Sequence, residues 1–445
     1  MTNTSTNSLG IKKGKKHSKF SRIAKLVTLV SFFHLSFFAF SQTDSLSDSG
    51  RCAQRDVADI IREALHKPPK VKTQGASSLI AFPIIGSNPA TGFMFGLGGQ
   101  YAFKMKESDL YSMVSGSLQF TSKSQFLAIF KNNIYTKGEK LFFTGDWRFQ
   151  IFSQSTYGLG TNAPEGGVLD YQFVLSGLET TQDSLAQPME YTFLRFHQSV
   201  GYKIKKSMYL GLGLNIDGYS KIRDLKLNLD PNNELITSHY AYSKKYKFDT
   251  SKYYSSSVIA NFVVDKRDNM IQPYRGYFLS LGWRGDLEML GAEKNANMLK
   301  GEWRSYHNVD KRNPTHLLAF WLIGEFSPEG QFPYMTLSAT SYDQRSRSGR
   351  GYAQGRFRGN QYTYGEAEYR FPISKCGGVW SGVAFLNATT ANNPAQRLGL
   401  FESVKAGYGV GLRIMLDKST RTNLVLDYGF GEKSSGFYLA VSETF

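Results

Sequence analysis

The chain of 445 residues carries a formal net charge of +17, contains 43 glycines, and is 41% hydrophobic and 14% aromatic. This composition is too polar for a helical membrane protein. The chain has only two cysteines, too few for a fold held by a disulfide framework. Many glycines and aromatic residues, with few helical stripes, favour β structure.

The N-terminal residues have the features of a secretory signal peptide. Seven Lys and Arg residues precede an apolar run at 26–40, and Ala39 and Ser41 are the small residues of a peptidase site. We therefore expect residues 1–41 to be removed on export, with Gln42 as the first mature residue. Subtracting these seven charges from +17 leaves +10, and so modest an excess on an exported protein argues against a nucleic-acid partner.

Residues 42–75 precede the first predicted strand and contain one helical pattern. Prolines at 68–69 end this pattern, so a short helix is predicted before them. Four apolar side chains would share one face of the helix: Val57, Ile60, Ile61 and Leu65.

The rest of the chain alternates apolar and polar residues with a period of two, as strands do when one face is apolar. In MYLGLGLNID, at 208–217, every second side chain is apolar. Most such segments have 10 to 15 residues, enough for a tilted strand to cross a bilayer. Sixteen strands are predicted, near 76–86, 91–105, 109–121, 124–136, 140–153, 190–205, 207–218, 253–265, 274–288, 295–309, 315–327, 361–373, 378–388, 404–416, 421–431 and 436–445.

The connections between these strands alternate in length. The long ones, 154–189, 219–252, 328–360 and 389–403, all follow odd-numbered strands, and every connection after an even-numbered strand is short. This asymmetry is typical of an outer-membrane barrel, whose even strand count leaves no open edge. We therefore predict an all-β, 16-stranded antiparallel transmembrane β-barrel over 76–445, with the N-terminal segment in the periplasm.

The last predicted strand, 436–445, ends on an aromatic residue. Such an ending resembles the signal read by the machinery that assembles outer-membrane proteins, although Glu443 occupies a position that is normally apolar. Four side chains of the strand are predicted to face outer-membrane lipid: Phe437, Leu439, Val441 and Phe445.

The connection 328–360 has five arginines between Arg345 and Arg358 and no acid among them. A solvated basic loop is the simplest interpretation. However, sixteen strands enclose a lumen wide enough for water, and a hairpin of about 16 residues each way could reach roughly 50 Å into it. An arginine in the lumen needs carboxylate partners. Glu366 and Glu368, on the inward face of the strand at 361–373, would supply them.

The motif GRGY at 349–352, followed by EAEYRFPI at 366–373, resembles the BamA/TamA surface-antigen superfamily. Its members insert barrels into the outer membrane or secrete polypeptides across it. In that family the tip of this loop tucks into the lumen, and the resemblance assigns that role to Arg350, Gly351 and Tyr352.

The turn DKRDNMIQPYRG is similar to a second pattern of the family. Four residues match it: Asp265, Asp268, Pro273 and Gly276.

Two features depart from the family. The strand after the loop usually has an aspartate that pairs with the loop arginine, whereas this chain has Asn387, which can hydrogen-bond Arg350 without neutralising it. The resemblance then implies that Glu366 or Glu368 carries the countercharge. Residues 42–75 are also about half as many as one POTRA domain needs, so the chain resembles a short, POTRA-less branch.

Cys52 lies just before the predicted helix, and Cys376 lies in a turn predicted at the same, periplasmic end. The two could form a disulfide, because the periplasm is oxidising. The helix itself could lie on the barrel rim, plug the lumen or dock a periplasmic partner, and these alternatives stay open.

The sequence has no pattern typical of an enzyme. Five histidines follow the leader without metal-binding spacing, and no nucleophile elbow is present. We therefore expect neither catalysis nor a metal or cofactor. The resemblance implies insertion or translocation of proteins or lipids at the outer membrane, with unfolded outer-membrane or surface proteins as clients. The alternative is a passive pore or a structural barrel without a client.

Overall fold

The computed structural model describes residues 54–68, 77–88, 92–162, 174–175, 178–179, 186–374 and 378–445. The predicted signal peptide and both Cys52 and Cys376 lie outside these residues. In the part of the chain that the structure describes, no helix is long and apolar enough to cross a bilayer.

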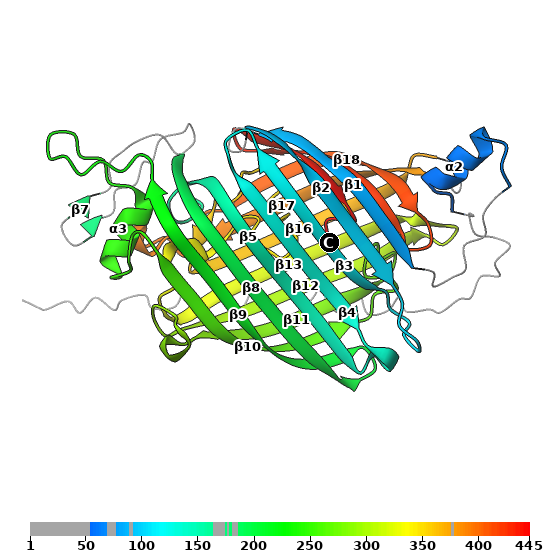
Figure 1. The fold of residues 1–445 in the computed structure, drawn as a ribbon, viewed down its shortest axis with the longest axis horizontal. Helices are drawn as coiled ribbons and strands as arrows, with labels where there is room; N and C mark the ends of the chain where they lie inside the picture. The colour runs from blue at the N-terminus through cyan, green and yellow to red at the C-terminus, as the bar shows by residue number, and fades with distance from the viewer. Residues whose placement is uncertain are drawn as a thin grey trace, which may run out of the picture. The chain divides into compact units, whose positions relative to one another are not determined.

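Sixteen long strands form one antiparallel sheet in which every neighbour in sequence is also a neighbour in space (Figure 1). The predicted fold, an all-β barrel of sixteen strands, is therefore confirmed. The strands are β1 (Ser78–Asn88), β2 (Gly92–Phe103), β3 (Ser112–Thr121), β4 (Phe126–Tyr135), β5 (Leu141–Thr156), β8 (Gln187–Lys205), β9 (Met208–Asp224), β10 (Tyr253–Asp265), β11 (Gly276–Asp286), β12 (Ala296–Asp310), β13 (Asn313–Gly330), β16 (Gln361–Pro372), β17 (Trp380–Ala391), β18 (Lys405–Asp417), β19 (Thr422–Gly431) and β20 (Ser434–Val441).

The remaining elements are short and belong to the N-terminal segment or to connections. Two are the helices α2 (Val57–Ala64) and α3 (Ser238–Lys245). Two short strand pairs are β6 (Val174–Leu175) with β7 (Leu178–Glu179), and β14 (Ser338–Ala339) with β15 (Arg358–Gly359). Single 3-10 turns lie at Lys137–Glu139, Glu288–Leu290, Tyr334–Thr336 and Pro394–Gln396.

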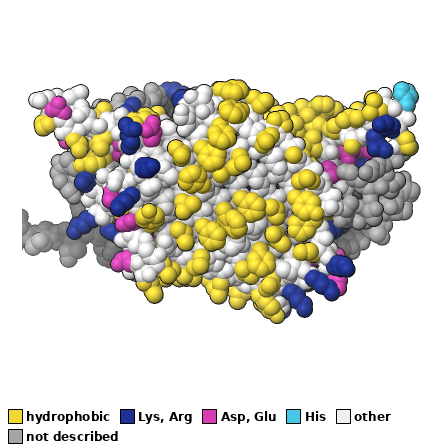
Figure 2. Space-filling model, viewed as in Figure 1, with side chains coloured by type: hydrophobic (Ala, Val, Ile, Leu, Met, Phe, Trp, Pro, Cys, Tyr) yellow, Lys and Arg dark blue, Asp and Glu magenta, His cyan; other side chains and the backbone are white. Residues whose placement is uncertain are grey.

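The two faces of the sheet differ in polarity as the alternation predicts. In β9, Leu210 and Leu212 are 58% and 67% exposed on the outer face, whereas the preceding Tyr209, which faces the lumen, is 1% exposed. Figure 2 shows apolar side chains spread over the middle of the outer surface, with charged side chains gathered towards its two ends. This apolar band is what a bilayer requires of the proteins that span it.

The connections also separate by length. The four longest, 157–186, 225–252, 331–360 and 392–404, all join strands at one end of the barrel, which we call the long-loop end. The opposite end, where the chain enters β1 and where the β18–β19 connection lies, is called the short-turn end.

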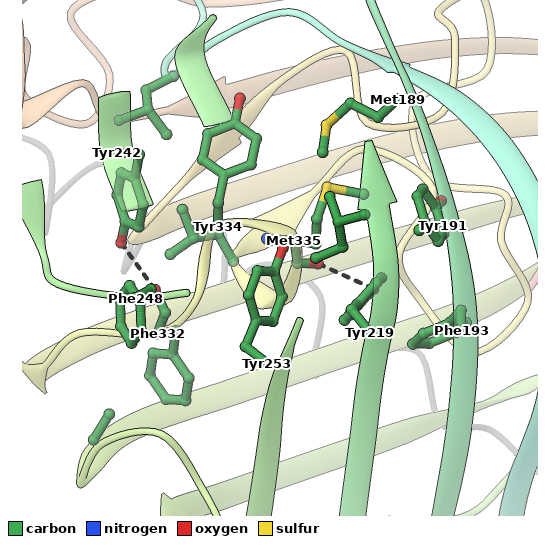
Figure 3. Close-up of a cluster of buried hydrophobic side chains, with 14 of the residues drawn as sticks. Met189, Tyr191, Phe193, Tyr219, Tyr242, Phe248, Tyr253, Phe332, Tyr334 and Met335 are labelled. Carbon is green, nitrogen blue, oxygen red and sulfur yellow. Dashed lines mark hydrogen bonds between the residues drawn. The ribbon is translucent and has the colours of Figure 1, made fainter. Parts of the chain in front are cut away.

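An aromatic cluster at the long-loop end packs α3 against the start of the 331–360 loop (Figure 3). The Tyr242 hydroxyl donates to the Phe332 carbonyl at 3.0 Å, and the Tyr219 hydroxyl donates to that of Met335 at 3.2 Å. Arg358, with 0% exposure, donates to the carbonyl of Tyr334 at 2.8 Å. These contacts fix both ends of the 331–360 loop at the barrel mouth, so its middle is directed into the lumen.

The end of the chain departs from the predicted strand at 436–445. Strand β20 stops at Val441, Ser442 adopts a left-handed φ of 74°, and Phe445 is fully buried. The prediction that Phe445 faces lipid was therefore wrong. Continued alternation would also have turned the Glu443 carboxylate towards lipid, where a charged group is unfavourable.

Candidate functional site

The tip of the 331–360 loop lies in the lumen, where Arg350 contacts three carboxylates. Its guanidinium donates to Glu366 at 2.6 Å and to Asp427 at 2.5 Å, and it also bonds Glu368. The guanidinium carbon lies 3.6 Å from the centre of the Phe385 ring, a cation–π contact. Burial alone would lower the pKa of Arg350, but the three carboxylates outweigh it and hold that pKa well above its ordinary value.

Strand β16 supplies two of these carboxylates because of its alternation. Glu366 and Glu368 are two residues apart, so both point inward and both are buried, while Tyr369 faces outward. These two glutamates were predicted to lie on the inward face, and the structure brings both of them to Arg350.

The rest of the GRGY motif fastens the tip to the last three strands. Gly351 has a φ of 104°, and a Cβ there would lie 2.6 Å from the Phe430 carbonyl, so only glycine fits this close approach. Its amide donates to the Tyr438 hydroxyl at 2.9 Å. The Tyr352 hydroxyl donates to the Ala406 carbonyl at 2.6 Å. The loop tip is thus held by backbone fit as well as by charge.

Asn387 and Asp427 share the task that the family pattern gives to one aspartate. Asn387 donates from Nδ2 to the Arg350 carbonyl at 3.0 Å and so positions the loop backbone. Asp427, on β19, carries the additional negative charge and was not among the predicted partners of Arg350. Its signal was available, because the inward alternation of β19 includes Asn423, Val425 and Asp427, but nothing local linked that strand to the loop.

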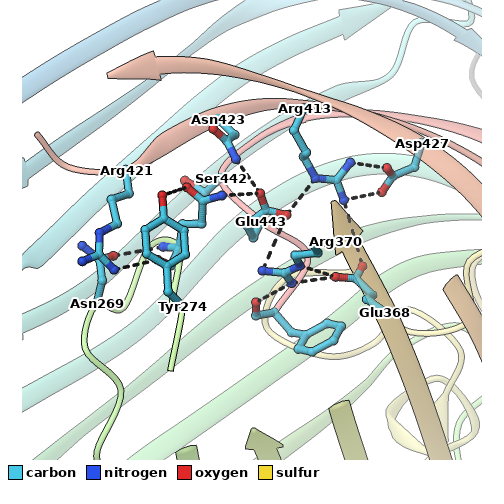
Figure 4. Close-up of polar contacts among 12 residues, drawn as sticks. Asn269, Tyr274, Glu368, Arg370, Arg413, Arg421, Asn423, Asp427, Ser442 and Glu443 are labelled. Atoms are coloured by element: carbon cyan, nitrogen blue, oxygen red, sulfur yellow. Dashed lines mark hydrogen bonds and ion pairs between the residues drawn. The ribbon is translucent and has the colours of Figure 1, made fainter. Parts of the chain in front are cut away.

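The ion-pair network continues beyond Arg350 towards the short-turn end (Figure 4). Arg370 binds Glu368 at 2.6 Å, and Arg413 binds both Asp427 and Glu443, the latter at 2.8 Å. Three arginines therefore alternate with four carboxylates across the barrel. Each of these seven charged groups has an opposite charge beside it, which offsets the cost of burying it in the low dielectric of a protein interior.

The predicted turn motif closes part of the short-turn end. Asp265 forms two bonds with the Arg267 guanidinium, at 2.9 and 2.7 Å. The Asp268 carboxylate accepts from the Tyr274 amide at 2.9 Å and binds Arg421 of the β18–β19 turn at 2.6 Å. The turn therefore reaches from β10 and β11 to a connection six strands away in the sheet.

The other two motif residues shape this turn. Pro273 is buried within it. Gly276 has a φ of 97°, and a Cβ there would lie 2.1 Å from the Lys266 carbonyl oxygen. A residue other than glycine would force the turn apart.

Helix α2 docks on the short-turn end through its polar side. Asp56 caps its first turn in a capping box with Asp59, and the Asp59 carboxylate binds Lys418 Nζ at 2.6 Å. Ile60 and Ile61, predicted to share an apolar face, are 42% and 52% exposed. In the described residues α2 therefore contacts the barrel next to β18 and leaves its apolar side uncovered.

We expect Lys418→Ala to weaken the docking of α2 by about 1 kcal/mol, because the pair is only partly exposed. Hydrogen exchange of residues 57–64 should then be about fivefold faster, and Lys67→Ala, an exposed change beyond the helix, should leave it unaltered. Burial raises the pKa of Asp59, but the hydrogen bond and charge of Lys418, together with the Asp56 bond and the charge of Arg55, outweigh burial and lower that pKa. The bridge should therefore persist at neutral pH and be lost as the pH falls through the lowered pKa of Asp59.

The outer residues of β20 lie where the sequence predicted. Phe437 and Leu439 are 64% and 46% exposed on the outer face, and Val441 is partly buried. Only Phe445, among the four residues predicted to face lipid, is turned inside.

The fold and the lumen network together define an outer-membrane β-barrel that holds one of its own long loops. The model of the Omp85 superfamily domain matches residues 94–445, so the chain belongs to the Omp85 superfamily. This match confirms the family resemblance predicted from the loop and turn motifs. A search of curated protein sequences gives no match.

Two solved structures are among those that the chain matches. The crystal structure of BamA from Haemophilus ducreyi lacking POTRA domains 1-3 has a TM-score of 0.49 and 12% identity, over 83% of this chain and 69% of that chain. CdiB from Escherichia coli has a TM-score of 0.43 and 12% identity, over 84% of this chain and 63% of that one.

Proposed function

We propose that the protein inserts polypeptides into the outer membrane or translocates them across it, with unfolded outer-membrane or surface proteins as clients. Membership of the Omp85 superfamily supports this assignment. The observation that carries it is the locked loop tip, because Arg350, the arginine of the family motif, is fully buried against three carboxylates. No chemical step is assigned to the chain.

The seam between the first and last strands is the proposed place of client entry. The described residues of β1 and β20 make no backbone pairing with each other. Side-chain bonds cross the gap instead, from Ser78 to Asp417 and from Ser442 to Gln100 at 2.7 Å. An edge with free backbone groups can accept another strand, which supports polypeptide handling at this position.

The short-turn end is proposed to face the periplasm, with the long loops at the cell surface. This orientation follows the usual asymmetry of outer-membrane barrels. It places α2 in the periplasm, where its uncovered apolar side is available to a periplasmic partner that delivers clients.

The test is quantitative outer-membrane proteomics of a deletion strain complemented with the wild type, with Arg350→Ala or with Arg275→Ala. Arg275 is exposed at the short-turn end and serves as the matched control. We expect a defined set of barrels or surface proteins to be lost on deletion and restored by the wild type and Arg275→Ala only. An unchanged proteome would reject the client role and favour a passive pore or structural barrel.

A further inference from the structure

The four residues after β20, Ser442–Phe445, cross into the lumen and are bound there as a ligand would be. Every one of them is at most 7% exposed. Their contacts come from β2, β12, β13, β16, β18 and β19, from Gln272 and from the loop 331–360. The segment therefore occupies a pocket built by both walls of the barrel.

The pocket recognises the Glu443 carboxylate with three different donors. Arg413 Nε donates to it at 2.8 Å, Asn423 Nδ2 at 2.7 Å and Gln272 Nε2 at 3.4 Å. Arg370 lies at 4.0 Å (Figure 4). Glutamine at position 443 would keep the shape but lose the two arginine charges as partners, so the pocket is specific for an acid.

The Phe445 ring lies in an aromatic part of the same pocket. Its centre is 5.2 Å from that of Trp321, with the planes stacked, and 6.1 Å from that of Tyr306. The Arg370 guanidinium lies 5.4 Å from the ring centre. The walls thus offer both a stacking surface and a cation to an aromatic side chain.

Two loop arginines bind the backbone of the segment. Arg345 donates to the Glu443 carbonyl at 2.9 Å, and Arg347 to that of Ser442 at 3.5 Å. Among the described residues neither guanidinium forms an ion pair with a carboxylate. Burial, together with nearby Arg304 and Arg267, lowers the pKa of Arg345 to about 9, so this region attracts further negative charge.

We propose that this lumen pocket is a binding site for extended polypeptide segments with an acidic residue two positions before an aromatic one, and that Ser442–Phe445 occupies it as an internal ligand. The inference rests on the proposed function, since it gives the chemistry by which a client segment is held. Thr444, between the acid and the aromatic, is 0% exposed, so a side chain no larger than threonine is expected at this position. A client segment would enter only when Ser442–Phe445 leaves.

The experiment measures fluorescence anisotropy of a labelled AVSETF peptide with the barrel folded in detergent micelles. A chain shortened to end at Val441 should bind the peptide at least tenfold more tightly than the full chain. Peptides in which glutamine replaces glutamate, or alanine replaces phenylalanine, should each bind at least tenfold more weakly. Arg413→Gln in the shortened chain should have the same effect as the glutamine peptide, and Arg275→Ala should have none.

Heat-modifiable gel mobility establishes that each variant is folded. If the shortened chain does not fold, the full-length Glu443→Gln/Phe445→Ala variant replaces it, because this change loosens the segment and keeps the chain length. Absence of peptide binding to the folded variant, or equal binding of all three peptides, would overturn the proposal. If the peptide binds specifically but the proteome of the deletion strain is unchanged, the pocket stands and the client role is rejected. If client proteins are lost on deletion but the peptide does not bind, the client role stands and the pocket is rejected.

Discussion

Arg350→Ala is expected to lower the free energy of unfolding by about 3–5 kcal/mol, the usual effect of removing one partner of a buried ion pair. The change leaves Glu366, Glu368 and Asp427 buried with two arginines in place of three. Urea titration of the folded barrel in detergent micelles measures the effect. Arg350→Lys should recover only part of the loss, because lysine restores the charge without the planar fork that binds several carboxylates at once.

Two controls separate charge balance from general damage. Arg275→Ala removes an exposed arginine and should leave the unfolding midpoint unchanged. Arg350→Met combined with Glu366→Gln and Asp427→Asn leaves two arginines facing two carboxylates, and it should recover more than half of the lost stability. If Arg350→Ala unfolds at the same urea concentration as Arg275→Ala, the lumen network does not hold the loop.

Removal of the loop tip, residues 341–356, is expected to raise the ion conductance of the barrel severalfold or more. Thr340 and Phe357 are already hydrogen-bonded across the base of the loop, with the Thr340 amide 3.0 Å from the Phe357 carbonyl. An Asn-Gly turn can therefore join them and keep the β14–β15 pair. The deletion empties part of a lumen that sixteen strands make wide enough for water. Single-channel recording in planar bilayers measures the change.

The matched control shortens a loop that does not enter the lumen. Asn228 and Leu235 bond each other across the base of an exposed hairpin, so an Asn-Gly turn can replace residues 229–234. Conductance of this variant should equal that of the wild type. A large conductance in the wild type, unchanged by the 341–356 deletion, would contradict the filled lumen and favour the passive pore.

The sequence alone determined the fold and the faces of the strands. Period-two alternation in segments such as 208–217 predicted which side chains face lipid, and the parity of connection lengths predicted sixteen strands with all long loops at one end. Both signals are local. The alternation of apolar and polar residues follows from the pleat of a β-strand, and the alternation of long and short connections follows from the reversal of chain direction at each turn. The same alternation placed Glu366 and Glu368 inward, within reach of an arginine loop long enough to enter the lumen.

Only the tertiary structure decided the rest of the site. Asp427 is separated from Arg350 by 77 residues, and the curling of the sheet around the inserted loop, which no local pattern encodes, brings them together. The alternation of β20 predicted Phe445 on the lipid face, yet the residue lies against Trp321 inside the barrel. Inside the barrel the Glu443 carboxylate has Arg413 as a charged partner and accepts a hydrogen bond from Asn423, neither of which lipid can provide. The chain therefore turns inward at Glu443 and carries Phe445 into the lumen with it.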